Sequence, residues 1–362
     1  MKLISTLLFI FIFSIAVNYA QSAASDTLDP YGYVNKYDTT FSGIGPKVYI
    51  LPLPRTLKEE MTDTYSEIQS FQDSIYAAFK DQRLLANFRP TSNAVAVHTL
   101  LTDSISPATM KTMIQRNIAQ NNHALAYGLL NSLALNLLYE GNKKEAIEAL
   151  RQALAQTQMG KAAADIAVIQ SNLASVYLLT NQLDEALDLE KSALAQAIKA
   201  KNPADQAFSY SRMALIQAYS KDYFLAENTI IRKAIPLFNK SKSYSGKIDA
   251  WIALAEIYRL QNKHTEAQWF LLQARDLAHA RNLQAPIATI EYMLGSSKLV
   301  QSNYRVAKEE LESAWQLAQE GENRYLQLAI IEQLGRSYVY LKDYESAKSY
   351  LNQYWDLRNL LF

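Results

Sequence analysis

The sequence predicts an all-α solenoid built from repeated helical hairpins, and three observations support this fold class. Two columns of small residues recur about every 40 residues from Asn121 onward. Only 10 Gly and 9 Pro occur in 362 residues, which disfavours a chain of β-turns. Hydrophobic residues make up 49% of the chain, so a mainly disordered protein is excluded. A chain of 362 residues is also longer than a single compact core usually accommodates, which favours two domains or an elongated array.

Charge and cysteine content narrow the functional classes further. The chain has 36 Lys and Arg against 35 Asp and Glu, so we expect no broad basic surface and no nucleic-acid partner. Cysteine is absent, which excludes disulfides, thiolate metal sites and a cysteine nucleophile.

The first residues have the pattern of a secretory signal peptide. Lys2 provides a positive start, residues 3–17 are mostly apolar, and small residues follow. We expect cleavage after Ala20, or as late as Ala24. An uncleaved membrane anchor is the alternative, although the apolar run is shorter than the roughly 20 residues that a span needs. No later segment is apolar enough to cross a membrane, so we expect an exported protein of the periplasm or cell envelope.

Residues 21–120 do not repeat, and we expect an extended part followed by helices. Several prolines in the segment 46–54 favour a polyproline-like or edge conformation. Thr56 and Glu59 have the spacing of a capping box. Apolar residues then follow a helical stripe, at Leu57, Met61, Tyr65, Ile68, Ile75 and Phe79. We interpret this region as a cap that covers the apolar end of the solenoid, with an independent binding domain as the alternative.

Residues 121–362 form the repeat array of six units. The first small column lies at Ala134, Ala174, Ala214, Ala255, Gly295 and Gly335. The second column follows 12 residues later, at Ala146, Ala186, Ala226, Ala267, Ala307 and Ala347. Helical periodicity breaks between the columns, so each unit is predicted to be two helices joined by a tight turn. Small residues at both positions allow the two helices to cross closely.

Three further sequence features concern the turns and the second helices of the repeat units. Asn and Asp at the turns are expected to cap the next helix with their side chains. A mostly apolar column follows four residues after the second small column, and Glu190 is its exception. Pro236 falls inside the second helix of the third unit, so we expect a kink or an early stop there.

These columns make the array resemble the tetratricopeptide repeat family. A tyrosine often follows three places after the first small residue in that family, and this chain has it at Tyr177, Tyr258 and Tyr338. The resemblance implies a right-handed superhelical solenoid of six hairpins, preceded by a non-repeat, mainly helical N-terminal cap. The usual period of the family is about 34 residues, so we expect about three extra residues in each helix.

The resemblance also implies where a partner binds, because the first helices of such hairpins line a concave groove. Carried over to this chain, the partner-binding groove comprises Asn131, Ser171, Asn172, Ser175, Phe208, Ser211, Arg212, Asp249, Glu256, Arg259, Tyr292, Glu332, Gln333 and Arg336. Asn both donates and accepts hydrogen bonds and Arg forks onto carboxylates, so such a groove suits a peptide backbone or terminal carboxylate. An ordinary solvated concave face is the alternative.

Asn172 and Arg212 also match two positions of the carboxylate clamp of chaperone-binding members. Leu135 and Phe208 depart from that clamp, which needs polar or basic residues there.

Catalytic signatures are nearly absent. The four histidines include no pair at the i,i+4 spacing of a helical metal site. Residues 43–45 lack the third glycine of a dinucleotide site, and no nucleophile elbow or phosphate loop occurs. We therefore expect a non-catalytic protein without cofactor or metal.

The resulting hypothesis is an interaction scaffold that holds a partner peptide or helix in its groove, as a component of an envelope complex. A ligand- or peptide-sensing module of an envelope signalling system is the second reading, and an enzyme is the third.

Overall fold

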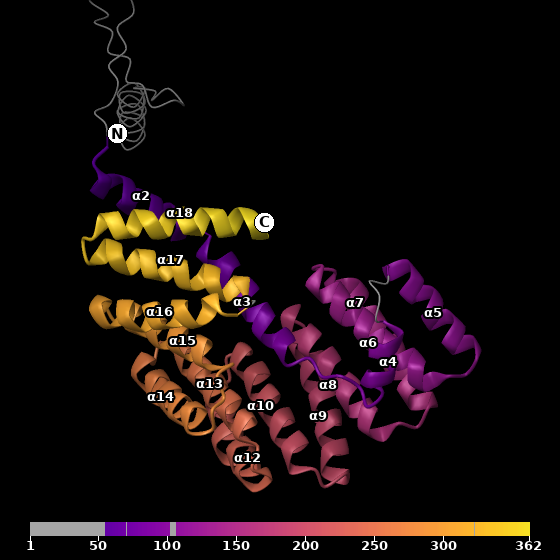
Figure 1. Cartoon of the computed structure of the whole chain (residues 1–362). Coiled ribbons are helices and arrows are strands. Elements are labelled where there is room, and N and C mark those ends of the chain that lie inside the picture. Colours follow the sequence, from indigo (N-terminus) through magenta and orange to yellow (C-terminus); the bar gives the residue numbers. More distant parts are fainter. Residues whose placement is uncertain (1–54, 70, 102–105, 322) are drawn as a thin grey trace, which may run out of the picture. The chain divides into compact units, whose positions relative to one another are not determined.

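The computed structural model describes residues 55–69, 71–101, 106–321 and 323–362, and nearly all of them are helical (Figure 1). The chain divides into two compact units, residues 1–60 and 61–362. The predicted signal peptide and the extended segment 46–54 lie outside the described residues. In the first unit, Thr56 and Glu59 form the expected capping box. The Thr56 amide donates to Glu59 Oε2 at 2.9 Å, and the Glu59 amide donates to Thr56 Oγ1 at 3.3 Å.

The helices follow the predicted order. Those before the repeats are α2 (Leu57–Gln69), α3 (Gln72–Ala86), α4 (Ala94–Leu100) and α5 (Pro107–Ala119). The first three hairpins are α6 (His123–Tyr139) with α7 (Lys143–Met159), α8 (Ala163–Leu179) with α9 (Leu183–Lys199), and α10 (Pro203–Tyr219) with α11 (Tyr223–Thr229), η1 (Ile230–Ala234) and α12 (Ile235–Ser241). The last three are α13 (Tyr244–Leu260) with α14 (His264–Ala280), α15 (Ile287–Val300) with α16 (Tyr304–Gln319), and α17 (Arg324–Tyr340) with α18 (Tyr344–Leu361).

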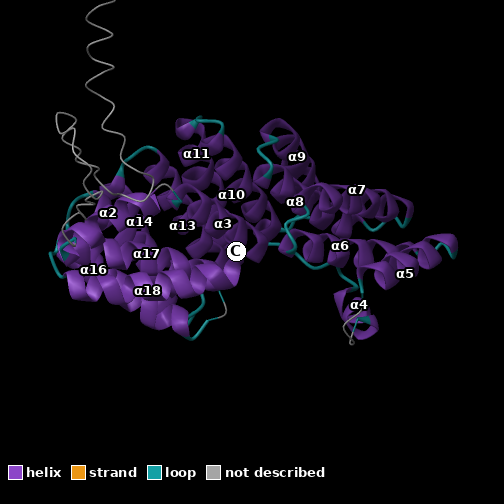
Figure 2. Ribbon diagram, turned by 90° about the horizontal axis from the view of Figure 1, so that it is seen from above, coloured by secondary structure: helices purple, strands orange, loops and turns teal. Residues whose placement is uncertain are grey.

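Each hairpin packs against the next along the chain, as α7 does against α8 and α9 against α10. Figure 2 shows only helices and loops in the described part of the chain. The predicted all-α solenoid of six hairpins, with a mainly helical N-terminal region, is therefore confirmed. None of the described helices is long and apolar enough to span a membrane.

The two small columns occupy the closest helix contacts. Every alanine of both columns is fully buried. A Cβ added at Gly295 would lie 2.6 Å from Leu311 Cγ of the paired helix α16, so this crossing requires glycine. Gly335 serves a different contact, because an added Cβ there would lie 1.7 Å from Tyr65 Oη of α2. The last unit therefore uses its small residue to accept the N-terminal region.

A left-handed residue ends the helices about every 20 residues. These residues, with φ between 51° and 80°, are Asn121, Gly141, Lys161, Asn181, Lys201, Lys221, Lys242, Asn262, Asn282, Ser302 and Lys342. The next amide bonds back to the carbonyl five residues earlier, as Gln182 does to Tyr177 at 2.8 Å. The turns between the first hairpins are thus as tight as turns within them, whereas the connection from α14 to α15 is longer. Both helices of the first hairpin contain 17 residues, so the extra length of the 40-residue repeat is shared between the two helices.

Side-chain capping is less general than the turn sequences predict. Asp222 and Asp343 accept from the amides of Leu225 and Ser346, at 3.2 and 3.1 Å. Asn142 makes no such bond, although it precedes α7. Asn181 instead takes the left-handed conformation itself, which asparagine tolerates better than most residues.

The third hairpin contains a π-turn where Pro236 predicted a kink. The Ile235 amide bonds to the Ile230 carbonyl, five residues back, and Pro236 follows in the first turn of α12. A π-turn holds one residue more than a regular α-helical turn. It therefore absorbs the extra residue of the single 41-residue step, between Ala214 and Ala255.

The N-terminal region of residues 61–119 does more than cap the solenoid. Helix α5 packs against α6 of the first hairpin, as the cap prediction expects. Helix α3, however, contacts both α17 and α8, which belong to the last and the second hairpin (Figure 1). The prediction of a cap at one end is therefore incomplete, because a single helix cannot contact both hairpins from the end of the array.

Candidate functional site

The chain's own N-terminal segment lies on the face predicted to bind a partner. We call the side of the first helices that contacts α3 and residues 87–93 the inner face. On it, the Phe79 and Tyr292 rings meet edge to face at 5.1 Å. Arg83 Nη1 lies 2.7 Å from Glu256 Oε2. The Ser92 amide donates to Asp165 Oδ1 at 2.8 Å. These contacts follow the segment from α15 through α13 to α8, so the predicted groove is partly filled.

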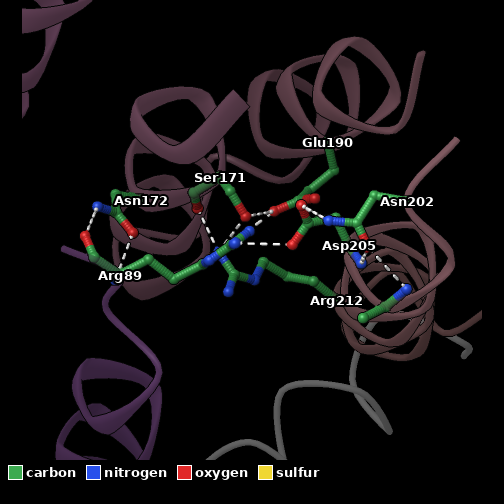
Figure 3. A network of polar contacts seen from close by, with 8 residues as sticks. Arg89, Ser171, Asn172, Glu190, Asn202, Asp205 and Arg212 are labelled. Atoms are coloured by element: carbon green, nitrogen blue, oxygen red, sulfur yellow. Dashed lines mark hydrogen bonds and ion pairs between the residues drawn. The ribbon is translucent and has the colours of Figure 1, made fainter. Parts of the chain in front are cut away.

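Two asparagines of the inner face bind the backbone of Arg89, and Figure 3 shows one of them, Asn172. Asn172 Oδ1 accepts from the Arg89 amide at 2.9 Å, and Asn172 Nδ2 donates to the Arg89 carbonyl at 2.8 Å. Asn131 Nδ2 donates to the same carbonyl at 3.2 Å. The backbone chemistry expected toward a partner peptide is thus present, and its ligand is this chain.

Charged side chains fix the two ends of this segment. Arg89 Nη2 lies 2.7 Å from Asp205 Oδ1 of α10. Glu256 accepts from Arg83 and from the Tyr219 hydroxyl. Burial alone would raise the pKa of Glu256, but the Arg83 guanidinium and the Tyr219 hydroxyl together lower it below its usual value. Glu256 therefore serves as the anion that holds α3 and is not free for a partner's cation.

Arg212 forms a buried ion pair inside the solenoid. Its Nη1 lies 3.3 Å from Glu190 Oε1 and donates to Ser171 Oγ at 2.7 Å (Figure 3). The same nitrogen donates to Ser175 Oγ, also at 2.7 Å. Ser171 Oγ also donates to Glu190 at 2.9 Å. Burial raises the pKa of Glu190, and Arg212 and Ser171 oppose that shift. The charge of Arg212 is thus used within the protein. The sequence showed Glu190 as an exception in the apolar column but not its pairing with Arg212.

The remaining predicted groove residues belong to two cavities beside α3. Cavity A, of about 470 Å³, is lined by Arg83, Phe88, Ser175, Phe208, Ser211, Arg212, Phe238, Asp249, Pro286 and their neighbours. Cavity B, of about 450 Å³, is lined by Ile75, Tyr76, Arg259, Tyr292, Ser296, Leu299, Val300, Ser302, Tyr304, Ala329, Glu332, Gln333, Arg336 and Tyr340. The structure therefore brings the predicted residues to one face but divides them between the bound segment and these cavities.

Within cavity A, aromatic and acidic groups remain available. Phe208 meets Phe238 edge to face at 5.0 Å. Asp249 is exposed and makes no ion pair with another described residue. The surrounding protein partly desolvates its carboxyl group, which raises the pKa of Asp249 from 3.8 to about 6. Cavity A therefore combines apolar rings with a carboxylate that titrates near neutral pH.

No metal centre accompanies these cavities in the part of the chain that the structure describes, since no three His, Asp or Glu side chains there are placed to hold an ion.

Comparisons with known proteins agree with this architecture. A family model for the tetratricopeptide repeat matches residues 329–358, within the last hairpin. The chain is similar in structure to the apo form of RapI, with a TM-score of 0.53 at 13% identity, over 81% of this chain and 87% of that one. A Rap protein complexed with Competence and Sporulation Factor gives a TM-score of 0.53 at 13% identity, over 84% and 99% of the two chains.

A third solved structure is BtubC from P. vanneervenii, with a TM-score of 0.50 at 16% identity, over 61% of this chain and 90% of that one. A comparison with curated proteins finds no match. At these identities the structural likeness concerns the fold. The chain thus contains a tetratricopeptide repeat and has the fold of tetratricopeptide-repeat solenoids, as the sequence columns predict.

Proposed function

We propose that this protein is a non-catalytic interaction scaffold that binds a partner peptide or helix on its inner face, in cavity A. The observation that carries this proposal is the binding of the Arg89 backbone by Asn131 and Asn172. It demonstrates side chains on this face that satisfy both the N–H and the C=O of a peptide. The similar Rap protein was solved with a bound factor, which supports the same use of the fold.

The composition of cavity A favours a partner that pairs an apolar side chain with a basic group. Phe88 and Phe208 offer aromatic surface, the kind of surface that dominates binding energies at interfaces, and the buried Phe238 packs behind Phe208. Asp249 lies on the same cavity wall and supplies an unpaired carboxylate. Arg83 and Arg212 pair with Glu256 and Glu190, and neither forms an ion pair with Asp249, although the charge of Arg83 favours its ionised form. A peptide with a Lys or Arg beside a large apolar residue is the expected ligand.

We also propose that the scaffold acts after export, in the periplasm or cell envelope. The support is the pattern of Lys2, the apolar residues 3–17 and the small residues that follow. Fractionation of cells that express the full chain, with N-terminal sequencing of the recovered protein, tests this proposal. A start at Gln21 or Ser25 is expected. A cytosolic protein that retains Met1 would contradict it.

Partner binding is tested by crosslinking in cells followed by mass spectrometry, with three variants of the full chain. Phe208→Ala and Asp249→Asn each alter cavity A and should reduce recovery of the partner at least fivefold. Phe224→Ala is the matched control, because Phe224 is 80% exposed on α11 and does not line the cavity. Equal recovery with all three variants would remove cavity A as the binding site.

The sensing module is the second candidate, and the bound segment of residues 87–93 is the observation that favours it. A ligand that displaces this segment would change the accessibility of α3. Hydrogen exchange measured by mass spectrometry distinguishes the two functions. A scaffold keeps residues 72–93 protected when its partner binds, whereas a sensor exposes them.

A further inference from the structure

Two residues that line cavity B each have a buried polar atom without a partner. Arg259 Nε and Gln333 Oε1 are buried and make no hydrogen bond with any other described group. Both residues line the cavity, and Gln333 is only 6% exposed. Buried polar groups in proteins nearly always have a partner, because leaving one unpaired costs about 1–3 kcal/mol. One unused donor and one unused acceptor in the same cavity indicate a ligand that carries the complementary pair.

The charges around cavity B favour an anion. Arg336 donates to Glu332, so these two opposite charges compensate each other. Glu256 lies on the same helix as Arg259, but it is engaged by Arg83 at 2.7 Å. Among the residues that the structure describes, Arg259 donates only to the neutral Ser296 Oγ, at 2.9 Å. Two arginines and one glutamate line the cavity, which therefore has one net positive charge.

Part of the lining of cavity B is apolar and aromatic. Tyr304 and Tyr340 stack with their ring centroids 4.4 Å apart and an angle of 14° between the rings. Leu299 and Val300 lie beside them in the lining. A volume of about 450 Å³ falls within the range of about 300–1,000 Å³ that is typical of small-molecule sites.

From these observations we propose that cavity B binds a carboxylate with an N–H group one carbon away and an aromatic or large apolar side group. The carboxylate pairs with the Arg259 guanidinium, which offers a fork of N–H donors. The ligand N–H donates to Gln333 Oε1, and the side group packs against Tyr304, Tyr340 and Leu299. A free amino acid and the C-terminal residue of a peptide both carry this chemistry. The site is separate from cavity A and does not depend on the function proposed there.

Isothermal titration calorimetry on the full chain tests the site with three probes. L-phenylalanine represents the free amino acid, and N-acetyl-L-phenylalanine represents a peptide C-terminus. N-acetyl-L-phenylalaninamide lacks the carboxylate and is the control for that group. We expect saturable binding of at least one acid and at least tenfold weaker binding of the amide. Whichever acid binds more tightly identifies the source of the ligand. Equal binding of acid and amide, or no binding of either acid, would overturn the proposal.

Variants then assign the binding to cavity B. Arg259→Gln should weaken binding of the acid at least tenfold, and Gln333→Met should weaken it severalfold. Arg232→Gln is the matched control, because Arg232 is exposed on η1 and does not line the cavity. Tyr340→Ser tests the aromatic side at a residue that is 50% exposed and tolerates change, so the site remains testable if Arg259→Gln does not fold. Undiminished binding by Tyr340→Ser and by the folded Arg259 or Gln333 variants would exclude cavity B.

Discussion

Single residues determine where charged groups are buried in this protein. Glu190 occupies a position that is apolar in the other repeats, and it is fully buried. Arg212, 9% exposed, compensates it across the α9–α10 contact. A buried carboxylate is tolerated only with such a partner, because its desolvation is costly. The pair therefore explains a polar residue in a packing column and an arginine that the resemblance to peptide-binding repeats would assign to a partner.

Removal of one member of this pair should be strongly destabilising. Arg212→Met leaves Glu190 uncompensated, and we expect the free energy of unfolding to fall by about 3–5 kcal/mol. Adding Glu190→Leu, which places an apolar residue at this position as in the other repeats, should recover most of that loss. Urea unfolding followed by circular dichroism measures both values. A double variant as unstable as the single one would show that the pair provides more than charge compensation.

Asp249 gives the stability a pH dependence. Its pKa is raised in the folded chain to about 6, so the folded state binds this proton more tightly than the unfolded state does. The resulting stabilisation is complete below the unfolded pKa and is lost as the pH rises through 6. Between pH 5 and pH 7 the melting temperature should therefore fall relative to that of Asp249→Asn. Parallel melting temperatures of the two proteins across this range would contradict the shift.

At the scale of helices, the π-turn links a repeat irregularity to a proline. Proline lacks the amide hydrogen and clashes with the carbonyl four residues earlier in a regular helix. The π-turn of residues 230–234 ends just before Pro236, which then occupies the first turn of α12. The apolar faces of α11 and α12 thereby both remain in the core, since Ala226 of α11 and Phe238 of α12 are buried.

Deletion of Ile231 tests this relation. The residue is 41% exposed, and its removal gives the third unit the common 40-residue length. Pro236 would then lie inside a continuous α-helix, which should cost about 3 kcal/mol. The same deletion combined with Pro236→Ala should be nearly neutral. Thermal unfolding of both variants measures the difference, and an equal loss in both would mean that the π-turn does not depend on the proline.

Across residues 61–362, the N-terminal segment connects distant hairpins. Tyr65 Oη donates to the Ala347 carbonyl at 3.0 Å in the last hairpin. Arg89 is bound by Asn131 and Asn172 of the first two. Solenoids otherwise depend on contacts between neighbouring repeats and unfold in parts. The N-terminal segment adds contacts to hairpins that are not neighbours of each other. The solenoid is therefore expected to unfold more cooperatively than nearest-neighbour contacts alone would allow.

Loss of the backbone clamp should uncouple the hairpins. Asn131→Ala with Asn172→Ala leaves the Arg89 carbonyl and amide without these partners, at a cost of about 1–3 kcal/mol for each unpaired group. We expect faster hydrogen exchange in residues 72–93 and a broader thermal transition. Asn142→Ala, at an exposed turn, is the matched control and should change neither quantity. Unchanged protection in the double variant would show that the remaining contacts, such as Arg89–Asp205 and Ser92–Asp165, are sufficient to hold the segment.

The sequence by itself determined the repeat architecture. Small residues at fixed spacing predicted the hairpins, and every alanine among them is buried at a helix contact. The capping box at Thr56 and the irregularity at Pro236 were also predictable. All of these features are local, because helix periodicity, capping and proline geometry involve residues within one or two turns of each other.

Only the tertiary structure decided what lies on the inner face. Arg83 and Glu256 are 173 residues apart in the chain, and Asn172 is 83 residues from Arg89. Gly335 repeats with the other small residues, but the Tyr65 ring that it accepts belongs to no repeat. Periodicity reports which side of a helix is buried and not what covers it. The covering segment follows from the path of the whole chain, and that path placed the N-terminal region where the sequence predicted only a partner.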